Sequence, residues 1–131
     1  MIPLTIAGAN GRPHRFRTEY AGTEAQQATG MMYRTHVPRG TGMIFPLTPQ
    51  RVATFWMHDC PSGLDLIFIA PGGVIESIGA NAPPMSDAIV ASKGVVAAVF
   101  EIGPGEAARL GIHAGDKAAW KAPLAQGEAV R

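Results

Sequence analysis

The stretch Leu64-Asp65-Leu66-Ile67-Phe68-Ile69-Ala70-Pro71-Gly72-Gly73-Val74-Ile75-Glu76-Ser77-Ile78-Gly79 decides the fold of this chain. Two apolar segments, residues 64–70 and 74–79, flank Pro71-Gly72-Gly73, and proline followed by glycine is typical of a tight turn. The stretch therefore predicts an antiparallel β-hairpin. A protein built from such hairpins, with helices set to one side, belongs to the α+β class rather than to the alternating α/β class.

The same pattern occurs towards the N-terminus. Residues 4–7 and 14–20 flank Asn10-Gly11, a dipeptide that suits the positive φ angles of a hairpin turn. We therefore expect an opening hairpin. Further strands are predicted over residues 42–47 and 52–57, separated by Pro49 and Gln50, over residues 95–102, and in a short segment after Gly115-Asp116.

Two short helices complete the pattern. Thr23 and Gln26 form a capping box, in which each end of the motif satisfies a backbone N–H group of the other, and it predicts a helix over residues 24–31. A second helix of one or two turns is expected over residues 106–110, where Gly111 ends it. The predicted fold is a compact, mostly antiparallel β-sheet or partial barrel with two short helices.

The chain has the length of one ordinary domain, with 131 residues and a mass of 13.7 kDa. We expect a single domain over residues 1–131, with a core at about 4–121 and a flexible tail at 122–131. The formal charge is +1 and no two Lys or Arg residues are adjacent, so nucleic acid is not a predicted partner. No apolar stretch approaches the roughly 20 residues that a transmembrane helix needs.

Candidate chemistry gathers in Phe55-Trp56-Met57-His58-Asp59-Cys60, which holds the only cysteine. If residues 54–60 are extended, Trp56, His58 and Cys60 share one face of the strand. An imidazole beside a thiol can hold it as a thiolate, which makes His58 and Cys60 the catalytic candidates. The alternative is that Cys60 is a small apolar filler and His58 lies at the rim of the fold.

Asp65 lies in an apolar strand, where an ionised carboxylate needs a partner. Arg34 is the expected partner, because a guanidinium can grip a carboxylate through two hydrogen bonds. Asp65 then either pins a strand end or takes part in ligand binding. Glu19 and Glu101 are further acids in predicted strands, and two carboxylates about 5 to 9 Å apart would resemble a glycosidase pair.

No metal site and no cofactor are predicted. A closed zinc site takes four Cys or His ligands, and the five such residues of this chain are scattered. Met31, Met32, Met43 and Met57, together with His58, would suit Cu(I). We favour the simpler interpretation that these methionines fill the core.

Several short motifs occur in a familiar order. They are Gly30-Met31-Met32-Tyr33-Arg34, Gly42-Met43-Ile44-Phe45, Phe55-Trp56-Met57, Leu64-Asp65-Leu66-Ile67-Phe68-Ile69, Phe100-Glu101-Ile102 and Gly115-Asp116. In these motifs, from about Phe16 to Trp120, the chain resembles the DUF192 family, also called UPF0127. The resemblance implies a small bacterial or archaeal protein without an established activity. It also implies an exported, periplasmic protein whose signal peptide is absent from this sequence, with a cytoplasmic location as the alternative.

The chain departs from the family pattern at two places near the candidate site. His58-Asp59-Cys60 stands where the family usually has Lys-Asn-Thr, and Ser62-Gly63 stands where it has Ile-Pro. Gln27 stands where the family commonly has an arginine in the first helix.

The preferred hypothesis is a non-catalytic protein that binds a small molecule or a partner protein in a groove. The residues expected to line this groove are Met32, Arg34, Trp56, His58, Asp59 and Asp65. The alternative is an enzyme, either a hydrolase or a thiol-dependent catalyst, that uses Cys60 and His58.

Overall fold

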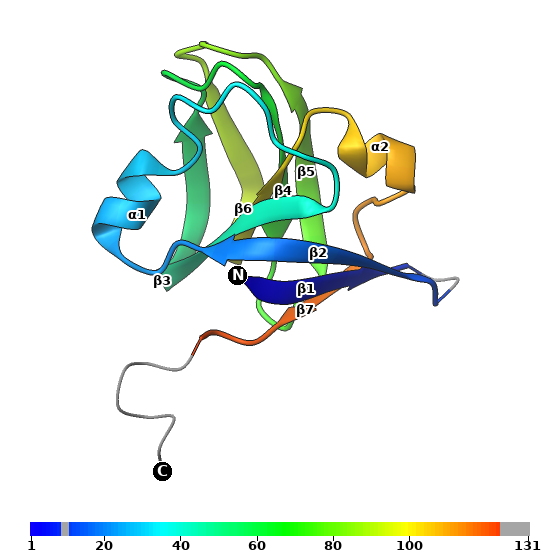
Figure 1. Ribbon diagram of the computed structural model, residues 1–131. Coiled ribbons are helices and arrows are strands. Elements are labelled where there is room, and N and C mark those ends of the chain that lie inside the picture. The colour runs from blue at the N-terminus through cyan, green and yellow to red at the C-terminus, as the bar shows by residue number, and fades with distance from the viewer. Residues whose placement is uncertain (9–10, 124–131) are drawn as a thin grey trace.

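The computed structural model describes residues 1–8 and 11–123 (Figure 1). In this part of the chain there are seven strands and two short helices, in the order β1 (Ile2–Ala7), β2 (Pro13–Tyr20), α1 (Glu24–Thr29), β3 (Thr41–Trp56), β4 (Leu64–Ile69), β5 (Ile75–Ala82), β6 (Ile89–Ile102), α2 (Glu106–Leu110) and β7 (Lys117–Trp120). The predicted α+β class is confirmed.

The strands form one sheet in the order β5-β4-β6-β3-β2-β1-β7. All the neighbouring pairs are antiparallel except β2 and β3, which run parallel. Figure 1 shows β1, β2 and β7 running across the direction of β4, β5 and β6, with α1 and α2 on opposite sides of the molecule. An isolated bridge between Val74 and Lys117 links the two edges locally. The sheet is nevertheless open, so a partial barrel stays a prediction.

Both predicted hairpins are present. β4 and β5 pair in an antiparallel register, and at their turn the Ala70 N–H donates to the Val74 carbonyl at 2.8 Å. β1 pairs along its whole length with β2, although Asn10 of the predicted turn lies outside the described residues. The predicted flexible tail also lies mostly outside them, because residues 124–131 are not described.

The predicted break at Pro49 and Gln50 is wrong, because β3 runs unbroken from Thr41 to Trp56. Its register against β6 shifts between Pro46 and Arg51, so an irregularity accommodates the proline and the strand continues. β6 is likewise longer than predicted and begins at Ile89.

The helices form where the capping signals predict them. At α1 the Thr23 hydroxyl accepts the Gln26 N–H at 3.1 Å, and the Gln26 side chain accepts the Thr23 N–H at 3.1 Å. The helix ends at Thr29, two residues before the predicted end, and Gly30 follows it with φ 47°. α2 covers the predicted residues and is followed by Gly111.

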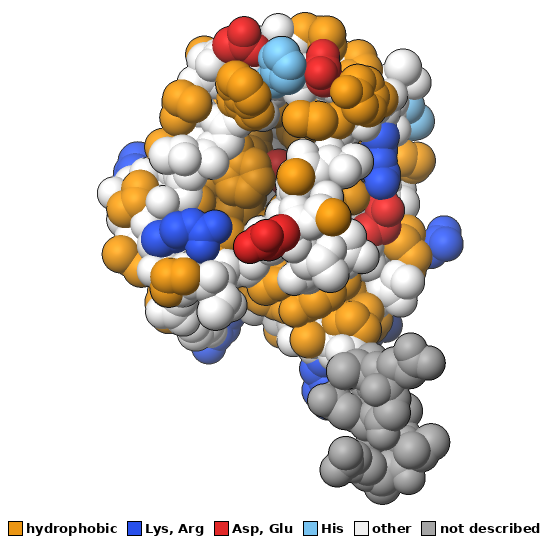
Figure 2. Space-filling view, turned by 90° about the vertical axis from the view of Figure 1, so that its left-hand side faces the viewer, with side chains coloured by type: hydrophobic (Ala, Val, Ile, Leu, Met, Phe, Trp, Pro, Cys, Tyr) orange, Lys and Arg blue, Asp and Glu red, His pale blue; other side chains and the backbone are white. Residues whose placement is uncertain are grey.

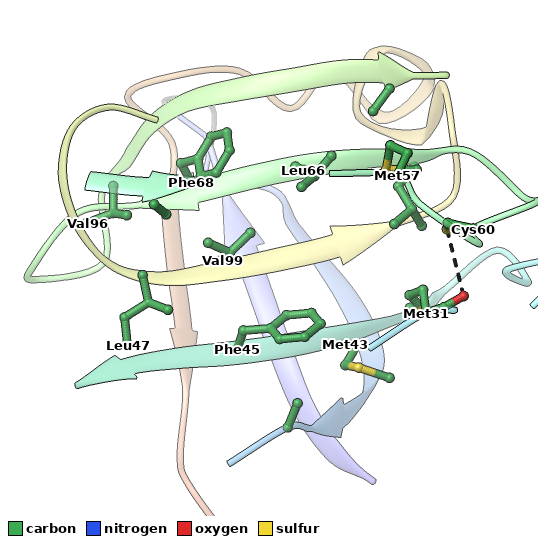
Figure 3. Close-up of a cluster of buried hydrophobic side chains, with 14 of the residues drawn as sticks. Met31, Met43, Phe45, Leu47, Met57, Cys60, Leu66, Phe68, Val96 and Val99 are labelled. Atoms are coloured by element: carbon green, nitrogen blue, oxygen red, sulfur yellow. Dashed lines mark hydrogen bonds between the residues drawn. The ribbon is translucent and has the colours of Figure 1, made fainter. Parts of the chain in front are cut away.

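The core consists of two clusters of buried hydrophobic side chains, one on each face of the sheet. β4 contributes to both, because alternate side chains point to opposite faces: Leu66 and Phe68 join one cluster, while Ile67 and Ile69 join the other. Figure 3 shows the first cluster, to which three of the methionines belong: Met31, Met43 and Met57. Their predicted role as core filling is confirmed.

Candidate functional site

A cavity of about 530 Å³ lies between α1, the end of β3 and the segment that follows it. Its hydrophobic wall includes Met31, Met32, Phe45, Phe55, Trp56 and Ile89, and its polar lining includes Gln27, Arg51, His58 and Glu101. Figure 2 shows this face of the molecule, on which hydrophobic side chains gather around a hollow and a histidine lies between two acidic side chains. The hollow is therefore apolar with a few polar groups, as small-molecule sites commonly are.

The wall formed by α1 is fixed by hydrogen bonds and close packing. The Gln27 side chain donates to the carbonyls of Ala21, at 3.0 Å, and Pro46, at 2.7 Å, and so ties the helix to β3. A Cβ atom at Gly30 would lie 3.3 Å from the Phe45 ring, so glycine lets the chain turn closely over this side chain. Hydrogen bonds and packing with residues outside the helix thus hold α1 in place.

Glu101 lies in the cavity lining and is 4% exposed. Over residues 1–8 and 11–123, no hydrogen-bond donor or cation contacts its carboxyl group. The carboxyl oxygens keep some exposure to the cavity. Burial raises the pKa of Glu101 to about 8, because the charged form loses its hydration. Its carboxyl is therefore mostly protonated at pH 7.

Glu101 lies in a row across the sheet. Met43 of β3 pairs with Glu101 on one side and with Glu19 of β2 on the other, so the Met43 side chain stands between the two acids. Glu19 lines a separate hollow of about 370 Å³ together with Arg34 and Met43. Neither hollow is lined by both acids, so a shared glycosidase-like cleft is not what the structure shows.

The rim of the cavity carries an aromatic stack. The rings of Trp56 and His58 lie 4.6 Å apart at an interplanar angle of 22°. His58 Nδ1 lies 2.8 Å from Asp87 Oδ1 and His58 Nε2 lies 3.3 Å from Asp59 Oδ2. The hydrogen bond with Asp87 raises the pKa of His58, and the charges of Asp59 and Asp87 act in the same direction.

The loops of the rim are joined through their backbones. The Tyr33 N–H donates to the Asp59 carbonyl at 2.6 Å, and the Met85 N–H donates to the Cys60 carbonyl at 3.1 Å. Tyr33, Asp59 and Met85 all have positive φ angles, of 66°, 54° and 58°. Such angles are uncommon outside glycine, so three strained residues meet at this rim.

The predicted row of Trp56, His58 and Cys60 is not formed, because the strand ends at Trp56 and Asp59 turns the chain. Cys60 points into the core instead (Figure 3), where its thiol donates to the Met31 carbonyl at 3.7 Å and lies 3.8 Å from Ser62 Oγ. Burial raises the pKa of the Cys60 thiol. A raised pKa opposes thiolate formation, so the geometry of a Cys/His nucleophile pair is absent.

Asp65 lies outside the cavity and is fully buried. Its carboxylate accepts backbone N–H groups from Asn81 at 2.8 Å, Gly105 at 3.0 Å and Ala107 at 2.9 Å. The predicted pairing with Arg34 is wrong, because Arg34 binds Glu19 through two hydrogen bonds. The backbone hydrogen bonds expected of the alternative, in which Asp65 pins a strand end, are present.

The structure therefore brings together only part of the predicted groove. Met32, Trp56 and His58 line the cavity, and Asp59 contacts His58 at its rim. Arg34 and Asp65 lie elsewhere. Glu101 is not among the residues predicted to line the groove, although an acidic residue between Phe100 and Ile102, in a strand rich in Val and Ala, indicates a buried acid.

A family model described as Uncharacterized ACR, DUF192, matches residues 5–120. The chain belongs to the DUF192 family. The match covers the resemblance that the short motifs predict, including the motif that carries Glu101.

Two solved structures are similar to this DUF192 chain. One is a protein of unknown function from Novosphingobium aromaticivorans DSM 12444, with 44% identity and a TM-score of 0.87 over 91% of this chain and 85% of that one. The other, described as a candidate transcription regulator, is from Sinorhizobium meliloti 1021, with 35% identity and a TM-score of 0.87 over 91% of this chain and 92% of that one. No curated protein matches the chain.

In this DUF192 chain His58 and Cys60 line the cavity, and Asp59 lies beside His58. The described residues hold no group of three or more His, Cys, Asp or Glu side chains that could bind a metal ion. They also contain no helix with the length and apolar character needed to cross a lipid bilayer.

Proposed function

We propose that this protein binds a small organic molecule in the cavity beneath Trp56 and His58, without catalysing a reaction on it. The observation that carries the proposal is the Glu101 carboxyl group, which is 4% exposed and lines the cavity without a partner among the described residues. No described residue occupies the hydrogen-bonding positions of this carboxyl group, so they are open to a ligand in the cavity.

The size and lining of the cavity support this proposal. A volume of about 530 Å³ falls in the range of roughly 300–1,000 Å³ that is usual for small-molecule sites. The hydrophobic wall presents aromatic rings, which offer a ligand a large contact area, and methionine thioethers, which adapt to its shape. Trp56 is half exposed and forms an aromatic edge of the opening.

The alternative, a hydrolase or thiol-dependent enzyme that uses Cys60 and His58, finds less support in the contacts. The His58 ring is engaged by Asp59 and Asp87, and the Cys60 thiol by Met31 and Ser62. No contact between the two functional groups is formed in the described part of the chain.

The test compares ligand binding to the wild type with binding to a variant whose cavity is closed. Thr54 lines the cavity and is exposed, so Thr54→Trp fills the opening with little disturbance of the core. Val95→Trp places the same side chain at an exposed position of β6 away from the cavity and serves as the matched control. Saturation-transfer NMR with a general fragment library is the measurement.

We expect fragments that bind the wild type and Val95→Trp but not Thr54→Trp. Fragments that bind all three proteins equally would place the binding elsewhere. A library without any binder would contradict the proposal.

A further inference from the structure

Glu101 differs from the other buried acids in its lack of hydrogen-bond partners. Four acids are buried among residues 1–8 and 11–123: Asp65, Glu101, Glu106 and Asp116. Asp65 accepts three backbone N–H groups, Glu106 binds the Arg109 guanidinium through two hydrogen bonds, and Asp116 accepts the His113 N–H at 3.1 Å. Only at Glu101 does this part of the chain supply neither a donor nor a cation.

The nearby basic side chains are already engaged. Arg34 is held by Glu19 on the far side of Met43, and Arg51 donates to the Pro49 carbonyl at 2.9 Å at an exposed position. His58 is held between two carboxylates at the rim. None of these three side chains pairs with Glu101, so its carboxyl group is open to a positive charge from a ligand.

The rest of the cavity suits the body of such a ligand. Phe45, Phe55 and Trp56 present aromatic rings, and Met31 and Met32 present thioethers. Aromatic rings attract a nearby cation through their negative faces. Glu101 is the only acid in the lining among the described residues, so it is the one lining residue that can pair with a cation through a carboxylate.

We propose that the ligand of this cavity is an organic cation, an amine with an apolar aromatic or aliphatic body, whose charged nitrogen pairs with the Glu101 carboxylate. This inference rests on the proposed binding function and names its ligand class. The ammonium group of the ligand pairs with Glu101 as the Arg109 guanidinium pairs with Glu106. The apolar body lies against the methionine and aromatic wall.

The proposed pairing of an amine with Glu101 makes ligand binding depend on pH. With a pKa of about 8, only about a tenth of Glu101 is ionised at pH 7, and the amine binds this fraction. Binding then releases about one proton, and the affinity for an amine with a pKa above 10 rises about tenfold from pH 7 to pH 9. A neutral ligand that accepts a hydrogen bond from the protonated carboxyl would show the opposite trend.

Other groups near Glu101 titrate or carry charge, and the experiment must separate them. The Cys60 thiol lies close enough to feel the Glu101 charge, His58 and Arg51 line the same cavity, and the Glu19–Arg34 pair lies beyond Met43. His58 loses its charge as the pH rises, which also favours a cation. His58→Gln removes this contribution and should keep the pH dependence that Glu101 causes.

The test uses matched sets of probes that differ in charge. On phenyl, indolyl and linear hexyl bodies, each set contains a primary amine, the corresponding alcohol and a carboxylate. Isothermal titration calorimetry at pH 7 and pH 9, in two buffers of different ionisation enthalpy, gives the affinity and the number of protons released. The proteins are the wild type, Glu101→Gln, His58→Gln and the closed-cavity variant Thr54→Trp.

We expect the amines to bind more tightly than their alcohols and carboxylates, with proton release that Glu101→Gln abolishes and His58→Gln retains. If the alcohols or carboxylates bind best and Thr54→Trp excludes them, the binding function stands and the cationic ligand is wrong. If no probe binds, both proposals fail. Amine binding that Glu101→Gln leaves intact would also overturn the inference.

Discussion

Trp56 and His58 stack at the rim of the cavity, with ring centroids 4.6 Å apart, and His58 is also held between Asp59 and Asp87. The indole covers one face of the imidazole while both ring nitrogens meet carboxylates. The protonated ring can donate from both nitrogens, so this arrangement favours its charged form.

The pKa of His58 should therefore depend on Asp87 more than on Asp59. Asp87→Asn removes the charged hydrogen-bond acceptor and should lower the pKa, because that bond is the largest cause of the increase. Asp59→Asn should lower it less. NMR titration of the histidine Cε1–H signals measures both, with His58→Gln identifying the signal of His58. Equal effects of the two substitutions would contradict the expected order.

Glu101→Gln should stabilise the protein at pH 7. The folded pKa of Glu101, about 8, lies above the ordinary value of 4.5, so ionisation opposes folding. The contribution of Glu101 to stability is fully present below pH 4.5 and is lost as the pH rises to about 8. At pH 7 this amounts to on the order of 3 kcal/mol, which a glutamine avoids because it does not ionise.

Urea unfolding at pH 4.5, 6 and 7.5 measures this difference, and Glu106→Gln is the control. The hydrogen bonds from Arg109 hold the pKa of Glu106 below its usual value, so this substitution should destabilise the protein at pH 7. A Glu101→Gln advantage that does not change with pH would show that Glu101 is already ionised or solvated in the folded protein.

Asp65→Asn should destabilise the fold by about 2–4 kcal/mol without changing ligand binding in the folded protein. One carboxylate oxygen accepts the N–H groups of Asn81 and Gly105, and the other accepts that of Ala107. An asparagine can replace only one of these oxygens and turns an N–H₂ group towards the remaining donor. Urea unfolding gives the loss, and calorimetry on the folded variant checks binding. Lost binding with unchanged stability would instead give Asp65 a functional role.

Cys60 should react slowly with iodoacetamide in the folded protein at pH 7.5. The thiol is buried and its pKa is raised by burial, so little thiolate is present. Mass spectrometry after timed alkylation, in buffer and in concentrated urea, should show rapid labelling only in urea. Rapid labelling of the folded protein would revive the thiol-dependent enzyme.

Local patterns predicted most of the fold because they are determined by neighbouring residues. The turn at Pro71-Gly72-Gly73 and the capping box of Thr23 and Gln26 need only a few residues to form. The break at Pro49 was predicted wrongly because an irregularity in strand pairing depends on β6, which is distant in sequence. The parallel pairing of β2 with β3 likewise depends on residues that are distant in sequence.

The site was harder to predict because it depends on which side chains find partners. Trp56 and His58 could be identified from residue type, and both line the cavity. The pairing of Arg34 with Glu19, in place of Asp65, is decided by tertiary packing. The same packing leaves Glu101 without a partner in the described part of the chain, which its sequence neighbours do not reveal.

Met43 separates two acids that differ in their partners. Its thioether is the partition between an acid that already has its arginine and an acid that has none. Under the proposed binding function, exchanging Met43 for another hydrophobic side chain would change the surroundings of Glu101 without the gain or loss of an ionisable group.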